Sequence, residues 1–149
     1  MKRIELQSKY RYNSLRKVKS WKKIEMARIL IVEDYDPIRW TLANLLQCEG
    51  YEVDQAANGR QALARLAIRQ FDAILMDVYM PGMNGLEACR RVRRTSQVPI
   101  LMFAAYGDPV MREEALNCGA DDFIVKPMDL ERLLAWVRRV GKGERRMVH

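Results

Sequence analysis

The sequence predicts an α/β fold, in which a five-stranded parallel sheet carries helices on both faces. Apolar runs of strand length alternate five times with stretches of helical period after residue 26, and the first run, Ile29 to Val32, is apolar throughout. A continuous apolar run is typical of a parallel strand that is buried on both faces. Strands alternating with helices are typical of a doubly wound sheet.

The first two strand and helix pairs follow from apolar spacing and turn residues. Asp36 can cap a helix after the first strand, and Pro37 suits its first turn. Apolar residues recur at helical spacing until Gly50 ends this helix: Ile38, Leu42, Leu45 and Leu46. Residues 51–56 alternate apolar with polar side chains and predict an edge strand. The second helix has one apolar face, formed by Ala62, Leu63, Leu66 and Ala67.

Three more strands are predicted at residues 71–76, 98–103 and 123–125. The helix after the third strand has an inner face of Leu86, Cys89 and Val92. Its outer face has four arginines, which we interpret as a solvated surface: Arg90, Arg91, Arg93 and Arg94.

Polar residues and glycine mark the limits of the last two helices. Asp108 and Pro109 begin the fourth helix, and Gly119 ends it. Asp129 caps the last helix, whose inner residues are Leu130, Leu133, Leu134 and Val137.

Charge divides the 149-residue chain unevenly. Residues 1–25 hold nine basic and two acidic residues and account for the whole net charge of +7, so residues 26–149 are neutral. A basic protein often binds nucleic acid, but here that inference applies only to the terminal segment. We expect an N-terminal arm at 1–25, which is native or an added extension, one domain at 26–140 and a tail at 141–149.

Several classes of protein are disfavoured by composition. The only histidine is His149, which argues against a histidine-based triad or metal cluster. Three separated cysteines, Cys48, Cys89 and Cys118, favour reduced thiols that fill the core over disulfides or a zinc site. No apolar stretch reaches the length of a membrane span, and no secretory signal is evident, so we expect a cytoplasmic protein with no membrane partner.

Charged residues follow the predicted strands at the edge where doubly wound sheets bind ligands. Glu33 and Asp34 follow the first strand, Asp77 the third and Lys126 the fifth. If the strand order is 2-1-3-4-5, the three carboxylates converge opposite one ammonium group. Carboxylates this close repel one another unless a cation lies among them, and Mg²⁺ prefers such oxygen ligands.

These residues resemble the signature of the response-regulator receiver domain. The matching motifs are Glu33-Asp34, the nine residues from Asp77 to Gly85, and Lys126-Pro127, in family order and spacing over residues 27–140. The resemblance implies a flavodoxin-like (βα)5 sandwich of strand order 2-1-3-4-5. It also implies a cis peptide bond before Pro127, a geometry open mainly to proline.

The resemblance further implies a phosphorylation switch in two-component signalling. Asp77 would accept a phosphoryl group from a sensor histidine kinase or phosphotransfer protein. Asp34, Asp77 and the Tyr79 backbone carbonyl would bind Mg²⁺ or Mn²⁺ directly, with Glu33 acting mainly through water. Lys126 would pair with the phosphoryl oxygens, so the domain would catalyse its own phosphorylation and dephosphorylation without being a conventional enzyme.

Two positions depart from or modify the family pattern. Ala104 stands where the family has Thr or Ser, so one hydrogen bond that would reward the active conformation is missing. Phe123 matches an aromatic residue whose rotation reports activation in the family, although ordinary core packing also explains it. Tyr79 and Tyr106 match positions that flank the phosphoryl group, and we expect them to shield it from water.

The sequence is also compatible with other functions. A degenerate receiver could act as a phosphorylation-independent interaction module, and the tyrosines and tryptophan of the arm could stack on nucleic-acid bases. Leu15, Val18 and Trp21 could instead form a docking helix. A haloacid-dehalogenase-type phosphatase would need a second Asp where Tyr79 stands.

The signal is expected to leave through contact with a downstream protein, since no output domain follows the last helix. In the family, the surface formed by the fourth helix, fifth strand and fifth helix is the usual candidate. Here it includes Arg112, Glu113, Asp121, Asp122, Glu131 and Arg132. We expect a stand-alone monomer or weak dimer.

Overall fold

Five strands alternate with five helices in the computed structural model, which describes residues 26–105 and 109–141. The strands are β1 (Arg28–Val32), β2 (Glu52–Ala56), β3 (Ala73–Asp77), β4 (Ile100–Ala104) and β5 (Asp122–Val125). The helices are α2 (Asp36–Cys48), α3 (Gly59–Ile68), α4 (Gly85–Arg93), α5 (Pro109–Asn117) and α6 (Leu130–Gly141). The predicted alternation is confirmed.

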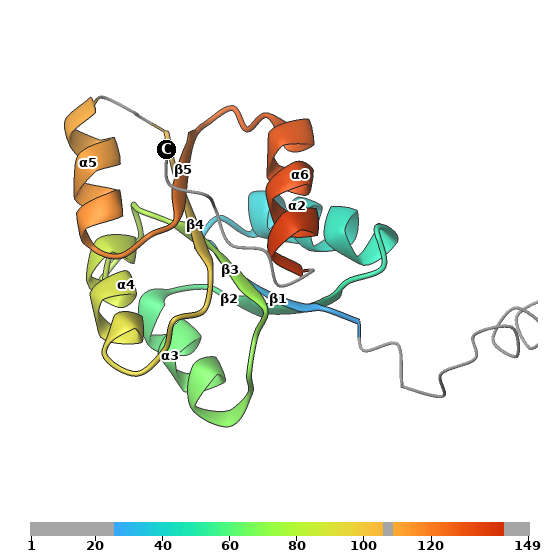
Figure 1. The fold of residues 1–149 in the computed structure, drawn as a ribbon, viewed down its shortest axis with the longest axis horizontal. Coiled ribbons are helices and arrows are strands. Elements are labelled where there is room, and N and C mark those ends of the chain that lie inside the picture. Colours follow the sequence, from blue (N-terminus) through green and yellow to red (C-terminus); the bar gives the residue numbers. More distant parts are fainter. Residues whose placement is uncertain (1–25, 106–108, 142–149) are drawn as a thin grey trace, which may run out of the picture.

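The strands form one parallel sheet of order β2-β1-β3-β4-β5, as expected (Figure 1). The order reverses at β1, which pairs with both β2 and β3. Val32 lies opposite Met76, so β1 and β3 end side by side. Ligands of open α/β sheets bind at such a reversal, beyond the carboxyl ends of the strands.

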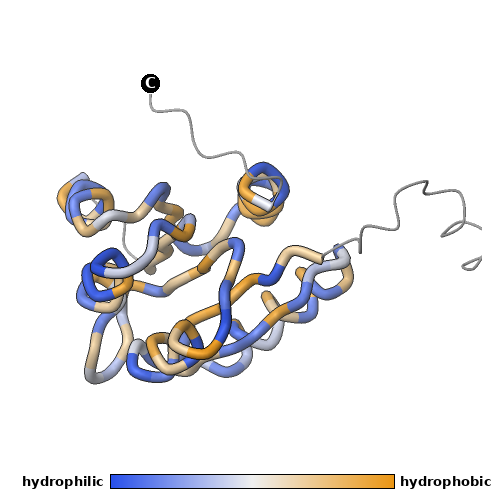
Figure 2. Tube along the Cα trace, turned by 60° about the horizontal axis from the view of Figure 1, so that its bottom comes forward, coloured by the Kyte–Doolittle hydropathy of each residue, from blue (hydrophilic) through white to orange (hydrophobic). Residues whose placement is uncertain are grey.

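Each face of the sheet has its own apolar core. On one face α2 and α6 cover alternate strand residues such as Ile31 and Leu75, together with Leu46 and Trp136. On the other face α3, α4 and α5 cover the intervening residues of the strands, such as Met76. In Figure 2 the hydrophobic colour concentrates on the strands, whereas the helices carry both colours. The fully apolar strand β1 is therefore explained by burial on two faces.

The helix termini agree with the sequence in part. Gly50 follows the end of α2 with a φ of 95°, and Asp129 caps α6 by accepting a hydrogen bond from the Arg132 backbone at 3.1 Å. The predicted capping by Asp36 is wrong, because Tyr35 is the N-cap residue and has no side-chain cap bond. The Asp36 carboxylate instead accepts a hydrogen bond from Arg39 at 2.6 Å. Asp108 lies outside the described residues.

Three predicted core positions differ from the structure. Leu130 is 45% exposed, and Ala67 and Cys48 are also exposed. Each lies near a helix end, where the sheet no longer covers the apolar face. Cys89 and Cys118 are buried free thiols, as predicted, and burial raises the pKa of Cys89 to about 11.

Arg93 does not belong to a solvated helix face. Its guanidinium donates to the backbone carbonyls of Val98 at 2.6 Å and Gly119 at 2.8 Å, and it pairs with Asp121 at 3.0 Å. Arg90, Arg91 and Arg94 are exposed, as predicted. The prediction for Arg93 failed because helical spacing gives the face of α4 but not the loops that approach it.

The described helices include none with the length and hydropathy needed to span a membrane.

Candidate functional site

Three carboxylates meet where β1 and β3 end. Asp77 is the last residue of β3, and Glu33 and Asp34 directly follow β1. One oxygen from each side chain lies within 4.8 Å of the others. Glu33 and Asp77 are buried, whereas Asp34 is exposed. We call these three residues the acidic cluster.

Lys126 reaches the acidic cluster from the end of β5, the strand at the edge of the sheet. Its ammonium group pairs with Glu33 Oε1 at 3.0 Å and with Asp77 Oδ2 at 3.2 Å. The Lys126-Pro127 peptide bond is cis, as expected, and the Lys126 ammonium lies 5.2 Å from the centre of the Phe103 ring. The sequence thus correctly predicted that β1, β3 and β5 bring these four charged groups together.

The two oxygens of Asp77 have different partners. Oδ2 faces Lys126, whereas Oδ1 accepts a hydrogen bond from the Tyr79 backbone at 3.2 Å. These contacts fix the plane of the carboxylate at the edge of the sheet. A carboxylate held in one orientation is suited to attack an electrophile that approaches from beyond the strand end.

The buried carboxyl of Glu33 supports a cation site. The pKa of Glu33 is raised to about 8, mainly by burial and then by the neighbouring Asp77, while Lys126 opposes the shift. Glu33 Oε2 is buried without a hydrogen-bond partner among the described residues. An oxygen-rich group of like charges with an unpartnered buried oxygen suits a hard divalent ion such as Mg²⁺.

Two further residues shape the site, and neither was assigned a role from the sequence. A Cβ atom at Gly85 would collide with the Asp77 backbone carbonyl, so only glycine allows α4 to begin this close to β3. Arg39 donates to the Glu33 backbone carbonyl at 2.8 Å and holds the end of β1. The motif from Asp77 to Gly85 could have indicated the role of Gly85. No motif in the sequence indicated that of Arg39.

The expected switch and flanking positions have different surroundings. Ala104 and Phe123 are buried on the α3, α4 and α5 face of the sheet, and Ala104 is the last residue of β4. Tyr79 is 49% exposed directly beside Asp77. Tyr106 lies outside the described residues.

The expected output surface is only partly available. Arg112, Glu113 and Glu131 are exposed. Asp121 pairs with Arg93 at the end of α4, which is outside this surface. Asp122 pairs with Arg132 of the same surface at 3.2 Å.

Comparison with known proteins assigns the chain to a family. The family model of the response regulator receiver domain matches residues 29–138, and the chain belongs to this family. It is therefore a receiver domain of two-component signalling, a phosphoacceptor rather than a conventional enzyme.

Solved structures share this fold over nearly their whole length. The chemotaxis protein CheY4 of Vibrio cholerae is 42% identical, with a TM-score of 0.73 over 77% of this chain and 98% of that one. TrrA of Thermotoga maritima, solved in complex with Mg²⁺ and BeF, is 34% identical, with a TM-score of 0.70 over 77% of this chain and 99% of that one.

Longer proteins match as well. The transcriptional regulatory protein AfsQ1 of Streptomyces coelicolor is 41% identical over 121 residues, which cover 80% of this chain and 54% of that protein. The response regulator ArlR of Staphylococcus saprophyticus is 40% identical over 113 residues, which cover 76% of this chain and 51% of that protein. The chain spans about half the length of these curated relatives.

Proposed function

We propose that this receiver is a stand-alone phosphorylation-dependent switch and that Asp77 is its phosphoacceptor. The observation that carries the proposal is the convergence of the acidic cluster with Lys126 at the reversal point of the sheet. Among the described residues, Asp77 is the member of the cluster that contacts both Lys126 and a backbone amide. These contacts support its role as the nucleophile over Glu33 and Asp34.

In the proposed reaction, a carboxylate oxygen of Asp77 attacks the phosphorus of a phosphohistidine on a sensor histidine kinase or phosphotransfer protein. The new bond joins the Asp77 oxygen to phosphorus, and the bond from phosphorus to the imidazole nitrogen breaks. The imidazole leaves with the electron pair and takes up a proton. Lys126, already 3.2 Å from Asp77, pairs with the transferred phosphoryl oxygens.

Asp34, Asp77 and the Tyr79 backbone carbonyl would hold Mg²⁺ or Mn²⁺ directly, and Glu33 would act mainly through water. The ion would supply positive charge that offsets the acidic cluster and the incoming phosphoryl oxygens. Burial of Glu33 and its unpartnered oxygen support this assignment. The same groups would orient the water that later removes the phosphoryl group.

Intact-mass measurement with acetyl phosphate and Mg²⁺ tests the proposal. We expect the full chain to gain one phosphoryl group and the Asp77→Asn variant to gain none. Asp72→Asn is the matched control, because Asp72 is exposed just before the other end of β3. Phosphorylation that persists in Asp77→Asn, or a wild type that gains none, would refute the assignment.

Ala104 favours a second function, a phosphorylation-independent interaction module. Its methyl group offers no donor to a phosphoryl oxygen, so phosphorylation gains less free energy from closing the β4 loop. The absence of phosphorylation in the mass measurement would favour this alternative. Equal binding of a downstream protein by phosphorylated and unphosphorylated chain would favour it too.

The division of the chain and its contacts complete the proposal. Residues 1–25 form a basic arm, native or added, residues 26–140 the receiver, and residues 141–149 a tail. The arm is the candidate for any nucleic-acid contact, which should weaken steeply with salt. A downstream protein would bind the exposed part of the α5, β5 and α6 surface, and the chain would be a monomer or weak dimer.

A further inference from the structure

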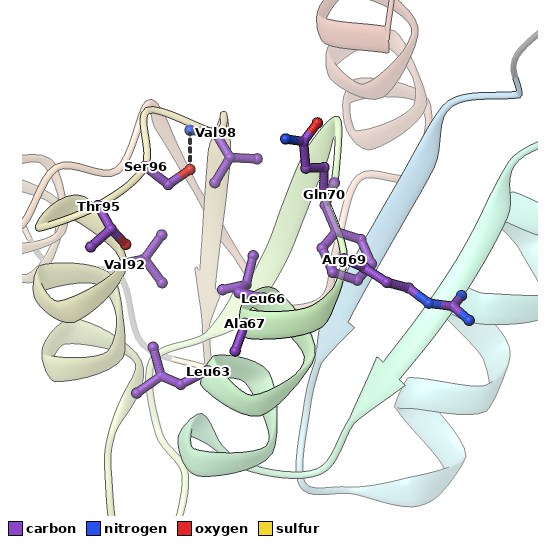
Figure 3. A pocket seen from close by; sticks show the side chains of 10 residues that line it. Leu63, Leu66, Ala67, Arg69, Gln70, Val92, Thr95, Ser96 and Val98 are labelled. Carbon is purple, nitrogen blue, oxygen red and sulfur yellow. Dashed lines mark hydrogen bonds between the residues drawn. The ribbon is translucent and has the colours of Figure 1, made fainter.

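A groove of about 560 Å³ lies between the second half of α3 and the end of α4, together with the loops that follow these helices. Figure 3 shows Leu63, Leu66 and Ala67 of α3 on one side, with Val92 and Val98 on the other. The groove lies at the edge where the strands begin, because Val98 precedes β4. A strand rises roughly 3.3 Å per residue, so this edge lies on the order of 16 Å from the acidic cluster. The groove is therefore a separate feature of the molecule.

Apolar side chains form much of the groove, and polar residues complete its lining: Arg69, Gln70, Thr95 and Ser96. Phe71, Val92 and Val98 are 8%, 2% and 7% exposed and belong to the core beneath α3 and α4. Leu63 and Leu66 are half-buried and pack against the same core. An occupant that covers these leucines removes more apolar surface from water, which stabilises the complex. Two or three apolar side chains of a partner suit a groove of this size and lining.

The helices beside the groove are strongly basic. Residues 59–71 and 85–98 carry seven arginines and one glutamate, whereas residues 26–149 as a whole have no net charge. Three of these arginines pair with acids, as Arg69–Asp54, Arg91–Glu87 and Arg93–Asp121. In the described parts of these two segments, four exposed arginines have no such ion pair: Arg60, Arg65, Arg90 and Arg94.

Two arginines lie beside the groove. Arg60 precedes Leu63 by three residues and Ala67 by seven, so it lies on the same face of α3 as these groove residues. Arg69 itself lines the groove, and its guanidinium, which pairs with Asp54 at 3.5 Å, is half-exposed. A half-exposed pair contributes little and exchanges partners readily.

We propose that the groove between α3 and α4 binds an acidic protein segment that carries two or three apolar side chains. The leucines of α3 and the valines of α4 receive the apolar side chains. The arginines of both helices pair with the flanking carboxylates, which sets the orientation of the segment and speeds its association. The partner is thus a second protein with a short acidic, amphipathic segment, held away from the acidic cluster.

Charge and side-chain type select this occupant over two others. The N-terminal segment of this chain offers Leu15, Val18 and Trp21, but its net charge of +7 opposes docking on basic helices. Single-stranded nucleic acid needs aromatic faces on which bases stack. Phe71, the aromatic residue that lines the groove, is buried.

Selection of displayed peptides tests the proposal. A library of random peptides about 16 residues long, roughly 24 Å as a helix, is panned on the immobilised full chain. Soluble Ala67→Glu variant in excess removes peptides that bind outside the groove. We expect enriched sequences to be acidic with apolar residues at helical spacing. No enrichment, or enrichment of basic or uncharged sequences, would overturn the proposal.

Affinities of the enriched peptides locate the site. Ala67→Glu should weaken binding about tenfold or more, because it places a carboxylate in the groove. Ala64→Glu is the matched control, since Ala64 is exposed on the same helix but does not line the groove. Arg60→Glu should weaken binding, whereas Arg112→Glu on α5 should not. Equal losses in the paired variants would refute the location.

Two experimental outcomes would show that the groove binds something other than an acidic protein segment. In the full chain, Val18→Glu with Trp21→Glu should leave the methyl resonances of Leu63 and Leu66 unchanged. A shift of these resonances would show that the arm fills the groove. Displacement of the peptide by an oligonucleotide, but not by a free acidic peptide, would assign the groove to nucleic acid.

Discussion

Arg93 and Glu33 of the acidic cluster are partly buried and buried charges at opposite ends of the strands, and they differ in how their polar atoms are satisfied. Arg93 has fixed partners in Val98, Gly119 and Asp121. Glu33 has Lys126 on one oxygen and no described partner on the other. A fully paired charge holds loops in place, whereas an unpaired buried oxygen leaves room for a ligand. The comparison separates a fully paired charge from one that keeps an unpartnered oxygen.

The largest effect that we predict from this difference concerns Arg93. Arg93→Met should lower the free energy of unfolding by about 2–4 kcal/mol, because it removes the charge that pairs with Asp121 and the donor to two backbone carbonyls. Denaturant unfolding measures the change. Arg91→Met, which breaks the half-exposed pair with Glu87, should cost about 0.5 kcal/mol or less. Similar losses in the two variants would show that Arg93 contributes no more to stability than an exposed arginine of the same helix.

The second prediction concerns the pH dependence caused by Glu33. The pKa of Glu33 is raised from 4.5 to about 8 in the folded chain, so folding favours its protonated form. Stability from this group is complete below pH 4.5 and is lost as pH rises towards 8. In the presence of a chelator we expect stability to fall by about 1–2 kcal/mol over this range, because the unfolded chain releases this proton at a lower pH than the folded chain does.

The matched variant for this prediction is Glu33→Gln, which resembles the protonated side chain. Its stability in chelator should change less with pH than that of the wild type. Saturating Mg²⁺ should restore wild-type stability near pH 8 and stabilise the variant less, because a divalent ion offsets the carboxylate charge. Parallel pH profiles for the two proteins, measured by thermal unfolding, would contradict the role given to Glu33.

The smallest effect concerns the phosphoryl lifetime. Tyr79 is half-exposed beside Asp77, so its ring can cover an acyl phosphate from water. The Tyr79→Ala, Tyr106→Ala double variant should lose phosphate about two to five times faster, equivalent to roughly 0.4–1 kcal/mol in the barrier. Mass measurement after removal of the phosphodonor gives both rates. Equal rates would rule shielding out.

Residues that follow strands were easier to predict than residues that face loops. Glu33, Asp34, Asp77 and Lys126 were placed by one rule, since parallel strands end at a common edge. The limits of β3 and β4 were less certain, and both strands end one residue later than predicted. Pro99 was placed within a strand, but β4 begins after it, because proline has no amide hydrogen for the ladder.

Contacts between segments far apart in the chain were not predictable. Arg93 has the helical spacing of its exposed neighbours, and its ion pair with Asp121 crosses 28 positions. Asp36 was expected to cap a helix, but Arg39 takes its carboxylate. For Arg93 the helical pattern was overruled by a partner that folding brings close, whereas the partner of Asp36 lies three residues away in the same helix.

The sequence by itself determined the alternation of strands and helices, the edge of the sheet that carries the carboxylates, and the confinement of the net charge to residues 1–25. These follow from apolar periodicity and composition, which are local properties. Only the tertiary structure decided that Arg93 is a structural charge, that Glu33 keeps an unpartnered oxygen, and that α3 and α4 leave an apolar groove between arginines. Such features depend on distances between side chains of different elements, and those distances exist only once the chain is packed.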